Sequence, residues 1–334
     1  MAEYKGIKGF KVQYLSADPS NPIVGQTWYN STSKDLKYTG VTTSGAWATG
    51  NTINTARSQG GGAGTFTAGI IFGGEIGPTP PVMTGATEEY DGNSWTNGNS
   101  MISGRRFFGS AGLQTAALCI AGEDATVGFS EAEEYDGTSW TVGGSIPAFR
   151  SGNAAAGLQT AAITFGGSPT PQVASFTYDG TTWTPAPNMN TVRYRLAGSG
   201  TQTAALGFAG NTPPPAFTAA TEEYNGTAWT SVNSMNTAGQ LRGGTGQGTQ
   251  TASLGFGGNV NPVATALRTT ATEEYDGTSW TNVAGLPVAK SAIMGGGTSS
   301  YAFSAGGNTP PGNVATTEEW LGAGSPQTKT ITAS

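Results

Sequence analysis

One recurring phrase constrains the fold of this chain more than any other feature. Two glutamates, a tyrosine, Asp and Gly are followed after two more residues by Trp, as in Glu88–Gly92 with Trp95. The phrase recurs with some degenerate copies, and the repeated tryptophans lie 43 to 51 residues apart. A period of this length with several strand signals is typical of β-propeller blades. The repeated aromatic positions are Trp47, Trp95, Trp140, Trp183, Trp229 and Trp280, with Tyr90, Tyr135, Tyr178, Tyr224 and Tyr275.

A second phrase lies between the first ones, a short apolar run closed by two small residues. Its closing glycines are Gly74, Gly122, Gly167, Gly210, Gly258 and Gly307. Each unit then divides into four strands, which in the second unit span 105–112, 115–122, 131–136 and 139–142. The Asp-Gly pair supplies a positive-φ position for the turn into the outer strand. The pattern predicts an all-β propeller of six four-stranded blades, with seven as the alternative.

The order of a Gly-Gly strand end, then Tyr, then Trp resembles the kelch motif over residues 56 to 322. The Asp-box of sialidase-type propellers is a poorer match, because Asp91 and Gly92 are adjacent here and the box separates Asp from Gly. A sialidase also needs an arginine triad with a Tyr/Glu pair, which we cannot assign. The copper enzymes of the kelch group need histidine ligands, and this sequence contains no histidine.

Composition narrows the functional classes further. The net charge is −6 with a pI near 4.7, which argues against binding nucleic acid through its phosphates. No apolar run is long enough for a membrane span, and the first residues do not resemble a secretion signal. Without histidine, and with Cys119 alone in an apolar run, the usual nucleophilic triads and zinc or copper sites cannot be assembled. We therefore expect no catalytic residue, no metal and no cofactor.

Charged residues repeat with the blades. A basic residue follows the blade Trp by ten positions in most units, and the paired glutamates recur in five of six third strands. The basic residues are Arg57, Arg105, Arg150, Arg193 and Lys290, with Arg242 three positions late. Paired carboxylates can serve as general acid and base, but neighbouring residues of a strand point to opposite faces. We predict that one Glu of each pair binds an Arg or backbone amides between blades.

Only Glu75, Glu123 and Asp124 are acids near loop starts that do not repeat. A glycan-cleaving enzyme would need two such carboxylates roughly 5 to 10 Å apart across a pocket. We expect these three to lie in different blades and to face solvent.

The loops between the second and third strands differ in each unit and are rich in proline. They span 75–85, 168–172, 211–217, 259–269 and 308–313. Variable, stiffened loops on one face of a rigid scaffold are where binding usually resides, although simple loop drift would give the same pattern. The candidate binding positions are Pro80, Pro81, Pro171, Pro214, Phe217, Pro262 and Pro311.

The two ends of the chain suggest how a ring would close. The last unit, at Glu318–Gly322, lacks a following Trp, whereas Trp47 has no unit before it. Residues 45 to 49 are thus expected to complete the last blade. In the competing scheme, residues 329 to 333 fill this place and the N-terminal strands form a seventh blade or a separate docking piece. We divide the chain into 1–50, a strand and docking segment, and 51–334, the propeller.

The phrase from Gly25 to Asn30, followed by Leu36-Lys37, Gly40 and Trp47, resembles a short module of tail-fibre and other virion proteins of tailed bacteriophages. Together with the kelch-like repeats, it resembles virion structural proteins of phages of marine and photosynthetic bacteria. The resemblance implies a non-catalytic virion component, a tail-fibre, tail-tip or capsid-surface protein, made in the host cytoplasm. Its partners would be other virion proteins and a host-surface glycan or receptor. A glycan-binding or glycan-cleaving propeller and an intracellular kelch scaffold are the alternatives.

Overall fold

The chain forms an all-β structure in a computed structural model that describes residues 12–20, 22–42, 44–77, 81–169, 172–214, 216–260, 267–324 and 326–331. The described residues contain no helix, and so none of the length and apolarity needed to cross a bilayer. Two compact units are present. The propeller-like unit is Ala46–Trp320, and the terminal unit combines Met1–Gly45 with Leu321–Ser334. These boundaries differ from our division at residue 50, because the last residues join the first ones.

The propeller-like unit contains six four-stranded sheets in the described residues, which we number in chain order. Their strands are, for sheet 1, β5 (Gly61–Thr65), β6 (Ala68–Phe72), β9 (Thr87–Tyr90) and β10 (Trp95–Gly98); for sheet 2, β11 (Gly109–Leu113), β12 (Ala116–Ile120), β13 (Glu131–Tyr135) and β14 (Trp140–Ser145); for sheet 3, β15 (Ala154–Leu158), β16 (Ala161–Phe165), β17 (Ser175–Tyr178) and β18 (Trp183–Ala186).

The other three sheets follow the same order from the centre outward. They are, for sheet 4, β19 (Ala197–Thr201), β20 (Ala204–Phe208), β23 (Thr221–Tyr224) and β24 (Trp229–Val232); for sheet 5, β25 (Gly243–Gly244), β26 (Ser253–Phe256), β27 (Thr272–Tyr275) and β28 (Trp280–Val283); for sheet 6, β29 (Met294–Gly297), β30 (Tyr301–Ala305), β33 (Thr317–Leu321) and β4 (Ala46–Gly50). Strand β4 thus takes the outer place in sheet 6, as the position of Trp47 predicts.

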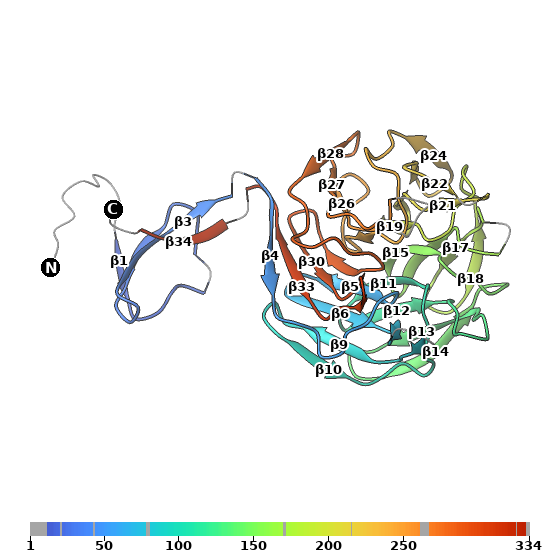
Figure 1. The fold of residues 1–334 in the computed structure, drawn as a ribbon, viewed down its shortest axis with the longest axis horizontal. Coiled ribbons are helices and arrows are strands. Elements are labelled where there is room, and N and C mark those ends of the chain that lie inside the picture. The colour runs from blue at the N-terminus through green and yellow to red at the C-terminus, as the bar shows by residue number, and fades with distance from the viewer. Residues whose placement is uncertain are drawn as a thin grey trace. The chain divides into compact units, whose positions relative to one another are not determined.

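The six sheets are arranged around a common centre, with β5, β11, β15 and β19 near the middle and β10, β14, β18 and β24 at the rim (Figure 1). Each first strand contacts the first strand of the next sheet, and β29 of sheet 6 contacts β5 of sheet 1. The architecture is therefore propeller-like. Three two-stranded hairpins extend from the loops between second and third strands: β7 (Glu75–Ile76) with β8 (Val82–Met83), β21 (Asn211–Thr212) with β22 (Ala216–Phe217), and β31 (Asn308–Thr309) with β32 (Gly312–Asn313).

The core lies between adjacent sheets. In sheet 1, Phe72 at the end of the second strand packs against Trp140 in the outer strand of sheet 2, with ring centroids 4.8 Å apart. The same contact recurs at Phe165–Trp229, Phe208–Trp280, Phe256–Trp47 and Phe303–Trp95. Sheet 2 has Ile120 in place of Phe, and Ile120 shares a cluster with Trp183. Each repeated Trp therefore covers the boundary with the preceding sheet, which places most of the apolar burial between sheets.

Hydrogen bonds from the repeated tryptophans also join most sheets to the preceding one. The indole N–H of Trp280 donates to Thr221 Oγ1 of sheet 4 at 3.0 Å. Equivalent bonds link Trp95 to Thr317, Trp140 to Thr87 and Trp47 to Thr272, whereas Trp183 donates to the Gly144 carbonyl. The indole N–H of Trp229 is buried without a partner, and so is the hydroxyl of Ser175, which stands in sheet 3 where four other sheets have Thr.

The terminal unit is a four-stranded sheet in the order β1 (Gln13–Leu15), β2 (Thr27–Asn30), β3 (Asp35–Val41) and β34 (Pro326–Thr330). The motif residues of this segment converge on Asp18. Its carboxylate accepts hydrogen bonds from Trp28 Nε1 at 2.9 Å and Asn30 Nδ2 at 2.7 Å, and pairs with Lys37 at 2.6 Å. The bond from Lys37 and the two others lower the pKa of Asp18 to about 2. The Trp-Tyr-Asn and Leu-Lys spacing thus has a structural role within this unit.

Candidate functional site at the axial opening

Six backbone hydrogen bonds close a ring around the axis of the propeller-like unit. Each bond joins two residues that lie just before the first strands of neighbouring sheets. The backbone N–H of one residue donates to the backbone carbonyl of the equivalent residue in the preceding unit. The ring runs through Gln59, Phe107, Gly152, Arg195, Leu241 and Ala292 and returns to Gln59, with N···O distances between 2.5 and 3.1 Å. All six residues have φ between 53° and 70°. Because this left-handed conformation recurs in every sheet, it belongs to the scaffold, and only the side chains differ.

The sequence carries a signal for five of these positions. In five units the ring residue stands two positions after the repeated basic residue, as Phe107 does after Arg105. In the fifth unit Gly239 occupies the basic position, and Leu241 lies two residues later. The late Arg242 folds back into the space that a side chain on Gly239 would fill, since a Cβ there would lie 3.1 Å from Arg242 Nε. The late arginine therefore restores the missing guanidinium.

The ring side chains form an aromatic and cationic group on one side of the axis. Gly152 has no side chain, and a Cβ at this position would lie 3.0 Å from Cγ of Arg195. The Arg195 side chain thus passes over Gly152 and stacks on Phe107, with Cζ 4.6 Å from the ring centroid. Such stacking is a favourable cation–π contact. Burial lowers the pKa of Arg195, while Tyr194 and Glu123 act in the opposite direction.

Beside this stack, Arg106 bridges two of the non-repeating acids. Its guanidinium lies 2.5 Å from Glu75 and 3.5 Å from Glu123. Gln59 donates to the other oxygen of Glu75 at 2.5 Å. Glu75 belongs to the loop of sheet 1, but Glu123 and Asp124 both lie in the loop between β12 and β13 of sheet 2, so the expectation of three different blades is wrong for these two. The expectation of solvent-facing carboxylates is wrong for Glu75, which is 9% exposed. The physical reason is Arg106, which holds both carboxylates at the axial side of the loops. Asp124 instead caps a turn through the amides of Thr126 and Val127.

The axial opening encloses about 120 Å³ and is lined by residues of all six sheets, including Gln59, Phe107, Asn153 and Arg195. At the opposite end, Gln247 lies across the axis. The backbone N–H of Gln247 donates to the Gly297 carbonyl of sheet 6 at 3.1 Å, and its side-chain Nε2 donates to the Gly112 carbonyl of sheet 2 at 2.7 Å. The turn carrying Gln247 is two residues longer than its counterpart in sheet 2. We call the side of the propeller-like unit that carries the loops between second and third strands the loop face.

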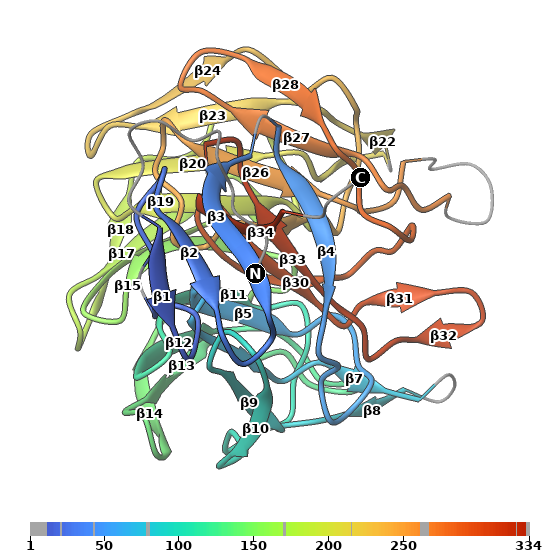
Figure 2. The same cartoon turned by 90° about the vertical axis from the view of Figure 1, so that its left-hand side faces the viewer.

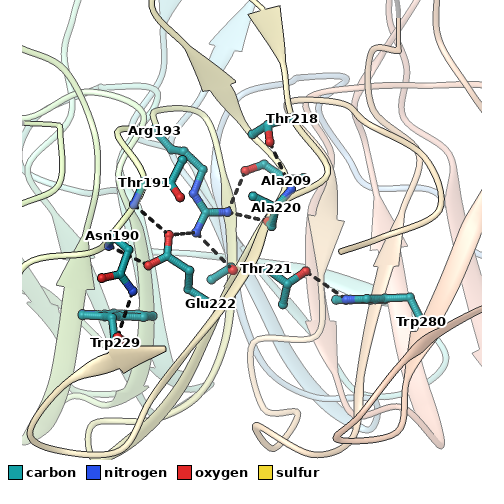
Figure 3. A network of polar contacts seen from close by, with 11 residues as sticks. Asn190, Thr191, Arg193, Ala209, Thr218, Ala220, Thr221, Glu222, Trp229 and Trp280 are labelled. Atoms are coloured by element: carbon teal, nitrogen blue, oxygen red, sulfur yellow. Dashed lines mark hydrogen bonds and ion pairs between the residues drawn. The ribbon is translucent and has the colours of Figure 1, made fainter. Parts of the chain in front are cut away.

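The repeated acids are structural, as predicted. Figure 3 shows the cluster of sheet 4, in which Glu222 accepts the amides of Asn190 at 2.7 Å and Thr191 at 3.1 Å and pairs with Arg193 at 2.9 Å. The Arg193 guanidinium also donates to the carbonyls of Ala209 and Ala220. Neither Arg193 nor Glu222 is exposed. Equivalent ion pairs join Arg57 to Glu88, Arg105 to Glu133 and Lys290 to Glu318.

The second glutamate of four of the five pairs binds a tyrosine of the neighbouring sheet, and Glu274 is the exception because sheet 6 has Trp320 at the tyrosine position. Tyr135 donates its hydroxyl to Glu89 of sheet 1 at 2.6 Å, and Tyr90, Tyr178 and Tyr275 make the same bond to Glu319, Glu134 and Glu223. Sheet 3 has Thr177 at this position, so Tyr224 bonds to the carbonyl of Gly226 instead. The repeated Tyr and Trp positions are thus structural. The closing glycines likewise adopt positive φ, at Gly74, Gly122, Gly167, Gly210, Gly258 and Gly307.

The predicted loop positions lie partly outside the described residues, which do not include Pro80, Pro171 and Pro262. Pro81 and Phe217 are half-buried in the hairpins β7–β8 and β21–β22, whereas Pro214 and Pro311 are exposed. Figure 2 shows β7–β8 and β31–β32 projecting on the same side of the molecule. The side chain of Asn313 in β32 donates to the Glu75 carbonyl in β7 at 2.9 Å. The loops of sheets 6 and 1 are therefore braced against each other.

Chemistry based on cysteine or on a metal cluster finds no support in the described residues. Cys119 is fully buried in β12, and this burial raises the pKa of its thiol far above the ordinary value. No group of three or more His, Cys, Asp or Glu side chains gathers in the described part of the chain. Of the features described here, the axial opening is the one that gathers non-repeating polar side chains.

No family model matches this sequence, and no curated protein matches it. Among solved structures, one described as the structure of YjhT is similar, with a TM-score of 0.66 and 12% sequence identity. The similarity covers 84% of this chain and 99% of that chain. At this identity the likeness concerns the fold alone.

Proposed function

We propose that this protein is a non-catalytic virion structural component of a tailed bacteriophage, which uses a six-bladed, kelch-like propeller closed by β4 for docking or host-surface binding. The observation that carries the proposal is the separation of the chain into two compact units. Strands β1, β2 and β3 form one small sheet with β34, and Trp28, Asn30 and Lys37 of the virion-like sequence phrase bind Asp18 in this unit. Both connections to the propeller-like unit, from β3 to β4 and from β33 to β34, start or end in that sheet.

The loop face supports a binding role. Its hairpins differ in sequence between sheets, while the scaffold beneath them repeats. The contact between Asn313 and Glu75 and the bond from Arg268 to Asn308 connect the loops of neighbouring sheets. Loops that are ordered before binding lose less conformational entropy when a partner docks. The partners would be other virion proteins through the terminal unit and a host-surface glycan or receptor through the loop face.

The non-catalytic reading is supported by the state of the acids. A glycosidase needs two carboxylates with a sugar between them. Here the guanidinium of Arg106 lies between Glu75 and Glu123, and the repeated glutamates other than Glu274 are bound to amides, Arg, Lys or Tyr. A glycan-cleaving function would require Arg106 to move away from both carboxylates.

A protein inventory of purified virions tests the proposal. The phage that carries this gene is grown on its host, virions are banded by density, and peptides are quantified by mass spectrometry. We expect peptides of this chain at a constant ratio to the capsid protein across the virion band. A non-structural phage enzyme is the control, since it should remain in the lysate. Recovery of this chain only with that enzyme would overturn the virion assignment.

A further inference from the structure

The charges at the axial opening are unevenly satisfied. Arg106 pairs with Glu75 and Glu123, and Gln59 donates to Glu75. Arg195 stacks on Phe107, yet its guanidinium makes no hydrogen bond or ion pair with any residue that the structure describes. Stacking uses the face of the guanidinium and leaves its N–H edge available, which is the geometry that binds an oxyanion with two parallel hydrogen bonds.

Gln59 and Asn153 line the same opening, and one side-chain oxygen of each is buried without a protein partner. Gln59 must direct its nitrogen toward the carboxylate of Glu75, which leaves Oε1 without a donor. Asn153 donates Nδ2 to Thr164 Oγ1 at 2.8 Å, and Thr164 in turn donates to the Ala154 carbonyl, so Asn153 Oδ1 is fixed as a free acceptor. Buried acceptors of this kind favour a ligand that brings its own donor.

We propose that the axial opening is a binding site for a small oxyanion that carries a hydroxyl group, with Arg195 as the residue that binds its charge. The guanidinium would hold two oxygens of a carboxylate or phosphate, and the ligand hydroxyl would donate to Gln59 Oε1 or Asn153 Oδ1. A volume of about 120 Å³ corresponds to roughly four water molecules, which suits one such group, free or at the end of a larger molecule. Gly152 is part of the site because its missing side chain lets Arg195 reach Phe107.

Isothermal titration calorimetry on the full chain at neutral pH tests this site with three probes. Inorganic phosphate and glycolate carry both an oxyanion and a hydroxyl donor, whereas acetate carries only the carboxylate. We expect saturable binding of phosphate or glycolate, and weaker binding of acetate. The tighter of the first two probes identifies the class of anion. No saturable binding of any probe by the unaltered chain would overturn the proposal.

Matched variants assign the binding to Arg195. Arg195→Gln removes the charge and the fork of donors, and we expect Kd to rise about 10- to 100-fold. Lys34→Gln removes one exposed positive charge from the terminal unit and should leave Kd unchanged. Phe107→Leu keeps Arg195 but removes the ring beneath it, and a rise of a few-fold is expected.

Near-ultraviolet circular dichroism establishes that each variant is folded. If Arg195→Gln does not fold, Arg195→Lys replaces it, because Lys keeps the charge without the planar fork and should still weaken binding measurably. Equal affinity in folded Arg195 variants and the unaltered chain would overturn the proposal. The test uses the purified chain alone, so its result is separate from whether the protein belongs to a virion.

Discussion

Arg193 and Arg195 lie two residues apart in the connection that enters sheet 4, and they meet opposite surroundings. Arg193 is unexposed, pairs with Glu222 and donates to the carbonyls of Ala209 and Ala220. Arg195 lies over Phe107 and makes no such bond with the described residues. The first arginine recurs in most units, whereas the second has Gln59, Phe107, Gly152, Leu241 and Ala292 as its counterparts.

The difference shows how this repeat architecture separates stability from recognition. The side chains that recur in most sheets meet similar partners each time: the repeated Arg or Lys binds within its own unit, whereas the repeated Tyr and Trp bind the neighbouring sheet. The ring around the axis keeps its backbone geometry in all six sheets, although its residues differ in side chain. Positions that share a backbone role but not a residue type are therefore where a binding site can develop.

The largest expected loss of stability comes from removing β4, the strand that completes sheet 6. In β4, Trp47 packs against Phe256 and Trp320 and donates to Thr272. Loss of a packed Trp costs about 3–5 kcal/mol, so a chain lacking residues 1–50 should melt roughly 10 °C or more below the full chain. Thermal unfolding followed by circular dichroism measures the change.

A chain lacking only residues 1–44 is the matched control, since it keeps β4 and loses β1, β2 and β3, three of the four strands of the terminal sheet. We expect its unfolding temperature to stay within a few degrees of the full chain for the propeller-like unit. An equal loss in both truncated chains would mean that β4 contributes little and that the repeating contacts do not carry the stability of the ring.

The second test removes the negative charge that pairs with Arg193. Glu222→Gln leaves the buried guanidinium of Arg193 without its counter-charge, and breaking a buried pair from one side costs about 3–5 kcal/mol. Denaturant unfolding at neutral pH measures the change. Glu274→Gln is the control, because sheet 6 has Trp320 where a Tyr would bind this glutamate, and the side chain of Glu274 makes no hydrogen bond with the described residues. Its expected cost is below about 1 kcal/mol. Similar losses in the two variants would refute a special role for the ion pair.

The sequence predicted the features that repetition makes visible. Trp47 indicated the outer strand of sheet 6, and the paired glutamates indicated contacts between structural elements. It did not predict the ring, because Gln59, Phe107 and Leu241 are not residue types that indicate positive φ. Nor did it predict that Arg106 joins Glu75 to Glu123, since that contact depends on how neighbouring sheets are placed. A contact that occurs only once in the molecule produces no periodic pattern in the sequence.

A third test uses alkaline pH on the tyrosine contacts. Burial and the bond to Glu134 raise the pKa of Tyr178 to about 12. A folded pKa above the unfolded value near 10 means that the stabilisation is complete below pH 10 and is lost as pH rises toward 12. The stability difference between the unaltered chain and Tyr178→Phe should therefore shrink over this window in denaturant unfolding. Tyr224→Phe is the control, since Tyr224 has no glutamate partner and the difference should be smaller at every pH.

The smallest expected effect tests the Arg195 side of the comparison. Arg195 has no partner whose burial would be left uncompensated, and its backbone keeps its place in the ring whatever its side chain. Arg195→Gln should therefore change the free energy of unfolding by no more than about 0.5 kcal/mol, with the loss of its contact to Phe107 as the main cost. Denaturant unfolding of Arg195→Gln and of Glu222→Gln under the same conditions allows the two losses of unfolding free energy to be compared. If Arg195→Gln destabilises the chain as much as Glu222→Gln does, then Arg195 is part of the scaffold, and the separation between repeating and non-repeating arginines fails. If the cost stays small, the guanidinium is held at the axial opening for something other than the stability of the fold.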